Sequence, residues 1–228
     1  MFFPLGDNAP LQVIRFQIVT LAIIVVNVVA FLATDVMQTE QTMLAIAAGF
    51  GVVPAEFFGF SPPLIGYDPI SEPLTLITYQ FLHASWGHLL SNMLFLWVFA
   101  DNVEDAFGHV AFLIFYILCG VAGALTHIAI APASVNPLIG ASGAVSGALG
   151  AYFLLFPRAR VLILFSFLLP LRLSAAWVLG GWFLLQLGSI FMSTGEVAVA
   201  FWAHIGGFIT GVVITLALRK RLLIRIGQ

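Results

Sequence analysis

A serine opens an apolar, glycine-rich stretch in the second half of the chain. Ser142 lies in the run GASGAVSG at residues 140–147, shortly after a proline. His204 lies in another apolar stretch that also carries glycines. A serine hydroxyl becomes an effective nucleophile when a histidine is placed to take its proton. The two residues therefore predict attack on a carbonyl carbon by Ser142, with His204 as the general base.

Two further polar residues could stabilise the oxyanion that such an attack produces. His88 and Asn92 are four residues apart, so they share one face of a predicted helix. Both can donate a hydrogen bond to a developing negative charge. Ser142 begins its own helix, where unpaired backbone N–H groups are available for the same purpose. Glu104 and Glu196 are predicted far from this level, which favours a Ser-His dyad over a triad.

The three reactive residues are predicted to lie at one depth in a membrane. Their distances from residues expected at the inner surface are nearly equal: Ser142 is 16 residues before Arg158, His204 is 15 before Arg219, and His88 is 16 before Glu104. At ~1.5 Å per helical residue, each lies ~23 Å above that surface. The hydrocarbon core is ~30 Å thick, so this level is below the outer surface.

Composition places these residues in a polytopic membrane protein. The chain has 228 residues, 61% of them hydrophobic and 8% charged, with a mean hydropathy of +1.10. Soluble domains carry about 25% charged residues. We predict one all-α domain over residues 1–228, with a retained first anchor and an interfacial loop at 35–75. Six transmembrane helices are predicted at residues 16–34, 77–100, 110–131, 142–156, 173–192 and 202–218.

The basic residues support this number of crossings. Six crossings put all eight on one side of the membrane: Arg15, Arg158, Arg160, Arg172, Arg219, Lys220, Arg221 and Arg225. The positive-inside rule makes that side cytoplasmic, together with both termini. The connection at 161–172 lies on the same side and is predicted to dip into the interface.

Glycines are spaced to let two of these helices touch. Gly143 and Gly147 form a GxxxG pair, and Gly207 and Gly211 form another. Small residues four apart allow helix backbones to approach closely. His204 lies on the same stripe as Gly207 and Gly211. We therefore expect the histidine-bearing face to pack on the helix of Ser142.

These motifs resemble the rhomboid family of intramembrane serine proteases. The matching stretches are GASG at 140–143, AHIGG at 203–207, FLH at 81–83, GHLLSNM at 87–93 and NVED at 102–105. The resemblance implies the basic six-helix bacterial form in the inner membrane, which cleaves other membrane proteins in or beside their transmembrane segments. It also implies oxyanion roles for His88, Asn92 and the Ser142 backbone, a lateral gate at 173–192 and a cap at 193–201.

One position departs from the family pattern. Some members have an aromatic residue four positions after the nucleophile, stacked on the catalytic histidine, where this chain has Ser146. Another side chain must then orient His204, and Phe201 and Trp202 are the candidates. The first loop also lacks the Trp-Arg pair of some members.

Other functions remain open on sequence grounds. A small-solute transporter would line its path with polar residues, but no internal repeat or buried charge is evident. A catalytically silent rhomboid-like protein would bind membrane clients, yet it would be expected to lack Ser142 or His204.

No cofactor, metal or nucleic acid is expected, since His83 and His88 lack the spacing of a zinc motif. The predicted partners are membrane-protein substrates and the lipid bilayer. Glu104 and Asp105 are predicted to cap the second helix and pair with arginines.

Overall fold

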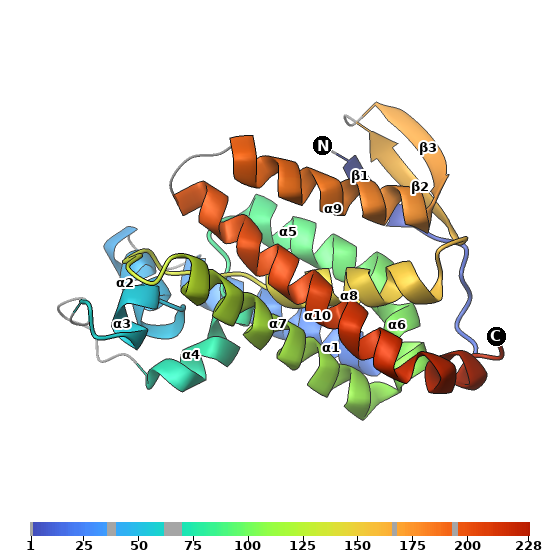
Figure 1. Cartoon of the computed structure of the whole chain (residues 1–228), viewed down its shortest axis with the longest axis horizontal. Helices are drawn as coiled ribbons and strands as arrows, with labels where there is room; N and C mark the ends of the chain where they lie inside the picture. Colours follow the sequence, from blue (N-terminus) through green and yellow to red (C-terminus); the bar gives the residue numbers. More distant parts are fainter. Residues whose placement is uncertain (1, 36–39, 62–69, 166–167, 193–195) are drawn as a thin grey trace.

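Helices make up most of the computed structural model, which describes residues 2–35, 40–61, 70–165, 168–192 and 196–228 (Figure 1). They are α1 (Ile18–Asp35), α2 (Glu40–Phe50), α3 (Pro54–Phe57), α4 (Glu72–Thr78), α5 (Trp86–Phe95), α6 (Asp101–Phe107), α7 (His109–Ile130), α8 (Ser142–Leu155), α9 (Ala175–Met192) and α10 (Glu196–Arg225). A 3₁₀ turn, η1 (Tyr79–Phe81), precedes α5, and a π-helical turn, η2 (Leu96–Ala100), joins α5 to α6.

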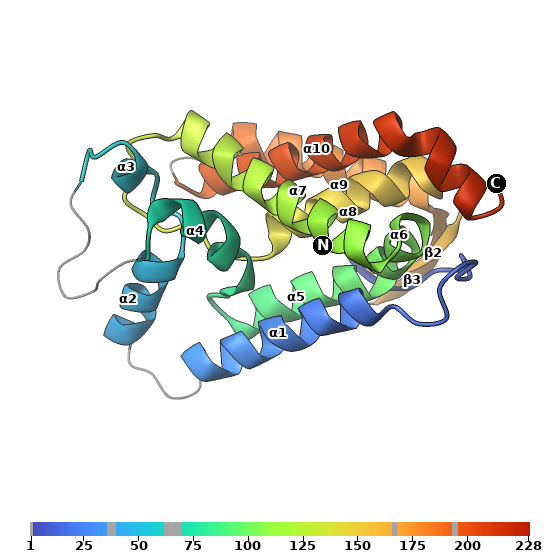
Figure 2. The same cartoon turned by 90° about the horizontal axis from the view of Figure 1, so that it is seen from below.

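The helix that begins with Ser142 is the centre of the bundle. Almost every residue of α8 is buried, including Gly143, Gly147 and Tyr152. Helices α7, α9 and α10 pack against it, and α10 runs across both α8 and α7 (Figure 1). Helices α1 and α5 form the opposite side of the bundle from α10 (Figure 2). A polar serine at the start of this helix is therefore enclosed by several helices.

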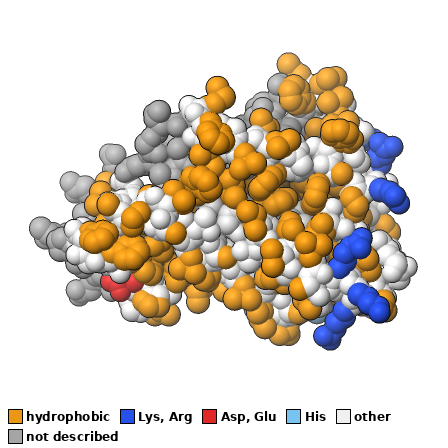
Figure 3. Space-filling view, viewed as in Figure 1, with side chains coloured by type: hydrophobic (Ala, Val, Ile, Leu, Met, Phe, Trp, Pro, Cys, Tyr) orange, Lys and Arg blue, Asp and Glu red, His pale blue; other side chains and the backbone are white. Residues whose placement is uncertain are grey.

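The outer surface is that of a membrane protein. Within the described residues, three helical segments are long and apolar enough to cross a membrane: His109–Ile130, Ala175–Met192 and Phe201–Arg225. Two shorter apolar helices are Ile18–Thr34 and Ser142–Leu155. Hydrophobic side chains cover most of the visible face, and Lys and Arg gather at the end where α10 finishes, here called the basic end (Figure 3). Six crossings and cytoplasmic termini stay predictions.

The predicted second helix is wrong at both of its ends. Instead of a helix over 77–100, the chain leaves the helical path after Phe81 and resumes it at Trp86. Ser85 has an extended backbone and its hydroxyl accepts a hydrogen bond from the His88 N–H at 3.2 Å, as an N-cap does. The helix then continues through η2 to Phe107. The predicted helix start is based on hydropathy, which depends on apolar content and does not detect an N-cap.

The connection after α8 is a hairpin, which the all-α prediction missed. Strands β2 (Arg160–Phe165) and β3 (Leu169–Ser174) pair antiparallel, and β1 (Phe2–Gly6) adds a third strand to β2. Residues 166–167 lie outside the described part of the hairpin. Alternating burial along β2 gives one covered face, which is a sheet pattern. The predicted dip into the interface stays a prediction.

Two predicted loops contain helices. The loop at 35–75 holds α2, α3 and the first turn of α4, while residues 36–39 and 62–69 lie outside the description. The predicted cap at 193–201 is helical from Glu196 onward, and residues 193–195 are not described. Helix α10 also continues past the predicted end at residue 218, to Arg225. Charged residues end an apolar span without ending a helix.

Acidic side chains at the basic end accept mainly from backbone N–H groups, and among the described residues Glu104 and Asp105 form no ion pair with an arginine. Glu104 accepts from the N–H groups of Val19 and Thr20, at 2.9 and 2.8 Å, in the first turn of α1. Asp105 accepts from three successive N–H groups, those of residues 12–14. The prediction of pairs between these carboxylates and arginines is therefore wrong. Unpaired N–H groups at a helix start attract carboxylates, and this contact secures α1 to α6.

Asp7 gives the fold a pH-dependent contact at the same end. Its carboxylate accepts from the Tyr152 hydroxyl and from the Ala9 N–H. Burial raises the pKa of Asp7 above its ordinary value of 3.8, against the opposing effect of these hydrogen bonds. A raised pKa means that the folded state favours the protonated carboxyl, so its contribution to stability falls as the pH rises above that value.

We expect Asp7→Asn to stabilise the protein more at pH 8 than at pH 4, relative to wild type. Asparagine keeps an acceptor for Tyr152 and removes the charge. Thermal unfolding in detergent at both pH values measures the difference, with about 2–4 °C expected for each kcal/mol. Asp7→Ala, which removes charge and acceptor, is the control. Equal shifts of the Asp7→Asn variant at both pH values would contradict the expectation.

Candidate active site

The loop that leads into Ser142 is held by distant parts of the chain. Val52 and Leu138 exchange two backbone hydrogen bonds, of 3.0 and 2.8 Å. The Gly140 N–H then donates to the Tyr79 carbonyl oxygen at 2.9 Å. Ser142 follows as the first residue of α8, half-buried. The position of the serine is thus fixed before its helix begins.

Gly140 allows His88 to approach this loop. Its φ of +124° is in the region that favours glycine. A Cβ at this position would lie 2.7 Å from the Cε1 atom of His88, which is closer than atoms can pack. A glycine is therefore required at this position for two reasons: the backbone conformation of the turn, and the space that the His88 imidazole occupies beside Ser142.

Glycines also bring α10 against α8. A Cβ on Gly207 would overlap the carbonyl oxygen of Gly143, and one on Gly211 would overlap that of Gly147. The backbones of the two helices are therefore in direct contact along this stripe. One turn before Gly207, the Nε2 atom of His204 lies 2.8 Å from the Oγ atom of Ser142. This is an ordinary hydrogen-bond distance, and it joins residues from two helices.

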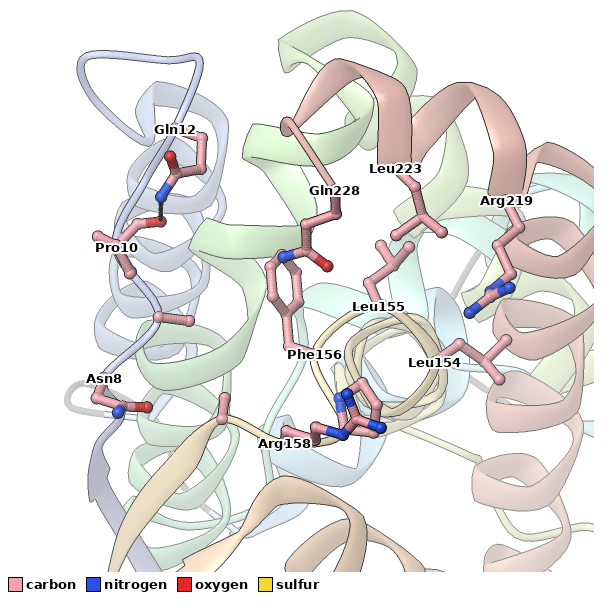
Figure 4. Close-up of a pocket in the computed structure, with 13 residues that line it drawn as sticks. Asn8, Pro10, Gln12, Leu154, Leu155, Phe156, Arg158, Arg219, Leu223 and Gln228 are labelled. Carbon is pink, nitrogen blue, oxygen red and sulfur yellow. Dashed lines mark hydrogen bonds between the residues drawn. The ribbon is translucent and has the colours of Figure 1, made fainter.

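A cavity of about 300 Å³ opens at this hydrogen bond. It contains the four residues for which chemistry is predicted: Ser142, His204, His88 and Asn92. Apolar side chains, among them Leu149 and Trp182, form much of the remaining wall. A second cavity, of about 540 Å³, lies at the basic end beside Arg158 and Arg219 and holds none of the predicted catalytic residues (Figure 4).

The two predicted oxyanion residues, His88 and Asn92, lie on α5. The Nδ2 atom of Asn92 donates to the His88 carbonyl oxygen at 3.0 Å. An amide nitrogen carries two hydrogens, so one is left for a ligand in the cavity. The His88 ring meets the His83 ring edge to face, with centroids 5.0 Å apart. His83 is buried outside the cavity lining, which agrees with a packing role.

Gln186 is hydrogen-bonded to His204, and it was not among the predicted site residues. The Oε1 atom of Gln186, on α9, lies 2.7 Å from the Nδ1 atom of His204. An amide oxygen only accepts, so Nδ1 carries the proton and the Nε2 lone pair faces the Ser142 hydroxyl. A polar amide inside a predicted membrane helix costs free energy unless it has a partner. The presence of Gln186 in the apolar stretch 173–192 could therefore have indicated a functional residue.

Rings flank the same imidazole. Phe201 meets His204 edge to face at 5.9 Å between centroids, and Trp182 lies 6.2 Å away. Phe201 was one of the two predicted candidates. Trp202, the other, makes no ring contact with His204 among the described residues. Ser146 occupies the position at which some family members have an aromatic residue. Its hydroxyl donates to the Ser142 carbonyl oxygen at 2.5 Å and not to the histidine.

The arrangement can activate a hydroxyl and stabilise an oxyanion. The described residues that line the cavity include no carboxylate, so Gln186 stands where an acid orients the histidine in a triad. The N–H groups in the first turn of α8 have no partner within the helix and point toward its N-terminus. Asn92 and His88 line the same cavity as Ser142, so they are the further candidate donors to an oxyanion.

Comparison with known proteins gives one consistent family. The family model described as "Rhomboid domain" matches residues 71–221. Rhomboid protein 1, mitochondrial, of Saccharomyces cerevisiae is 32% identical over 158 residues, which cover 65% of this chain and 43% of that protein. Rhomboid-like protein 11, chloroplastic, of Arabidopsis thaliana is 32% identical over 151 residues, 63% of this chain and 52% of that protein.

A bacterial relative is similar over a shorter region. Rhomboid protease GluP of Bacillus subtilis is 38% identical over 76 residues, which cover 33% of this chain and 14% of that protein. The matched part of the chain thus spans about half or less of the length of each of these relatives.

Proposed function

The chain belongs to the rhomboid family, and from this membership we propose that it is an intramembrane serine endopeptidase. Its substrates would be membrane proteins, cut in or beside their transmembrane helices. The observation that carries the proposal is the 2.8 Å contact between the Ser142 hydroxyl and the His204 imidazole in a cavity within an apolar bundle. Such a contact is the defining geometry of an activated serine.

The reaction would proceed through an acyl-enzyme. The Ser142 oxygen bonds to the substrate carbonyl carbon while the Nε2 atom of His204 takes the hydroxyl proton. Asn92, His88 and the N–H of Ser142 would donate to the resulting oxyanion. The C–N bond then breaks as His204 gives its proton to the leaving amine. Water, deprotonated by the same histidine, attacks the ester carbon. The ester C–O bond then breaks as His204 returns the proton to the Ser142 oxygen, which releases the carboxyl product.

The setting of this reaction is also part of the proposal. Six crossings with both termini on the cytoplasmic side would put the dyad below the outer surface. The arginines and lysine at the basic end support that orientation through the positive-inside rule. We propose a bacterial inner membrane as the location of the chain. Among the relatives named above, only the Bacillus subtilis protein is bacterial, and the other two are mitochondrial and chloroplastic.

Reconstituted liposomes test the function. A reporter with one transmembrane helix between two soluble tags should be cut, and a fluorophosphonate should label the protein and stop the cleavage. A matched reporter with a soluble linker in place of the helix should stay intact. Absence of both labelling and cleavage would overturn the proposal. Binding of the reporter without either would favour the silent, client-binding alternative.

Loss of an oxyanion donor should slow catalysis without unfolding the protein. We expect Asn92→Ala and His88→Ala each to lower turnover of the reporter by ~10²-fold, the usual effect of one such donor. Ser91→Ala is the matched control and should leave the rate unchanged, because Ser91 lines the same cavity from the same helix but gives its one hydroxyl hydrogen to the His88 carbonyl oxygen. Initial rates of reporter cleavage measure the effect. Unchanged rates in both variants would refute the oxyanion assignment.

A further inference from the structure

Helix α9 is packed firmly at one end only. Ala175, Val178 and Leu179, near its start at the hairpin, are at most 4% exposed. Toward the other end Leu184 is 67% exposed, Phe191 86% and Met192 89%. Trp177, near the start, is also 79% exposed, so the helix has an outward face there too, but no residue of α9 after Leu179 is buried. The start of α9 is therefore anchored in the bundle, and the far half has few contacts to hold it there.

Between these ends, α9 contacts the helix of the predicted base. The Phe183 ring stacks on Phe208 of α10, with centroids 4.5 Å apart. One turn further along α9, Gln186 reaches His204 at 2.7 Å. The stacked rings thus hold α9 at the position where the amide meets the imidazole. Beyond Gln186, residues 187–190 are half-buried, and Phe191 and Met192 at the end of α9 are exposed.

We propose that Gln186 is a positioning residue that couples the docking of α9 on α10 to the competence of His204. The inference rests on the proposed function, since it concerns the same dyad. With α9 docked, the amide oxygen holds the proton on Nδ1 and leaves Nε2 free to accept from Ser142. With α9 displaced, that acceptor is absent, and the ring can rotate or carry its proton on Nε2, where it cannot act as a base.

This coupling makes acylation depend on the position of a helix that contributes no reacting atom. The family resemblance already implies a lateral gate at residues 173–192, and displacement of α9 by a substrate helix at that gate would take Gln186 away from His204. The serine would then become reactive only when α9 returns over the bound segment. The amide would link entry and chemistry through one hydrogen bond, without contact between Gln186 and the scissile bond.

Substitutions at Gln186 separate positioning from packing. Gln186→Leu keeps the size of the side chain and removes the acceptor, and it should lower the rate of fluorophosphonate labelling by about tenfold, as for one ordinary hydrogen bond. Gln186→Glu keeps an acceptor at the same place and should stay within about threefold of wild type. Leu184→Ala, on the lipid side of the same helix, should have no effect. A merely structural role would not predict rescue by glutamate.

A double-mutant cycle tests the link to docking. Phe183→Ala removes the stack with Phe208 but does not touch the cavity. It should slow labelling by about threefold or more when Gln186 is present, and cause no further loss in the Gln186→Leu background. Thermal unfolding of each variant controls for folding. Wild-type labelling rates in Gln186→Leu would overturn the positioning role, and equal losses in both backgrounds would overturn the coupling. A wild type without Ser142-dependent labelling would instead refute the proposed function.

Discussion

Replacing Ser142 by alanine is expected to abolish reporter cleavage and fluorophosphonate labelling together. The loss in turnover should be about 10⁴-fold or more, because the variant lacks the hydroxyl proposed to form the acyl-enzyme. The fold should be unaffected, since Ser142 is half-buried at the start of α8 and its hydroxyl lies in the cavity. Cleavage rates in liposomes and thermal unfolding in detergent measure the two consequences separately.

Two companion variants make the result specific. Ser146→Ala removes a hydroxyl one turn further along α8 that donates to a backbone oxygen, and labelling should persist. The double variant Ser142→Ala/His204→Ala should be no slower than Ser142→Ala, because residues that act as a unit lose their effects together. Residual labelling of Ser142→Ala at the wild-type rate would show that another residue is the nucleophile.

The second large effect is expected at a residue with no chemistry of its own. Gly207→Ala should destabilise the bundle by about 3 kcal/mol or more, the upper range for overpacking. The added methyl group would overlap the Gly143 carbonyl oxygen and its neighbouring backbone atoms. Backbone atoms cannot turn aside as a side chain can, so α10 must move away from α8. Unfolding by a denaturing detergent, followed by circular dichroism, measures the loss.

The helices offer a matched control for this substitution. Gly181 lies in α9, and a Cβ there would meet no atom within 4 Å. Gly181→Ala should therefore be neutral or stabilise by up to ~1 kcal/mol through helix propensity. Gly207→Ala should also slow labelling, because His204 moves with α10. Equal stability of the two variants would contradict the inference that backbone contact at Gly207 holds the helices together.

The main features of the candidate site follow from short patterns in the sequence. Two GxxxG stripes and the order of the motifs indicate which helix faces meet, and the structure brings Ser142 within 2.8 Å of His204. These patterns depend on residue size and on helix period, which a sequence displays directly. The same is true of the apolar segments that became α1, α7, α8 and α9, each predicted within two residues at both ends.

Features that depend on a single hydrogen bond or on pairing of distant segments were missed. The cap at Ser85 changes the start of α5 without changing its hydropathy. The sheet needs residues 2–6 to meet a segment more than 150 residues later. Gln186 is one amide among apolar neighbours, and only the crossing of α9 over α10 gives it a partner. Tertiary contacts of this kind leave no periodic signal.

The separation of the two residues of the proposed dyad along the chain has a consequence for biosynthesis. Ser142 and His204 are 62 residues apart, and they belong to different helices. At about 5–20 residues per second, a ribosome makes the serine roughly 3–12 s before the histidine. Until α10 is inserted, the serine has no base and its neighbours on α8 have no partner backbone. If Ser142 and His204 act as proposed, a nascent chain would have no proteolytic activity until α10 docks on α8.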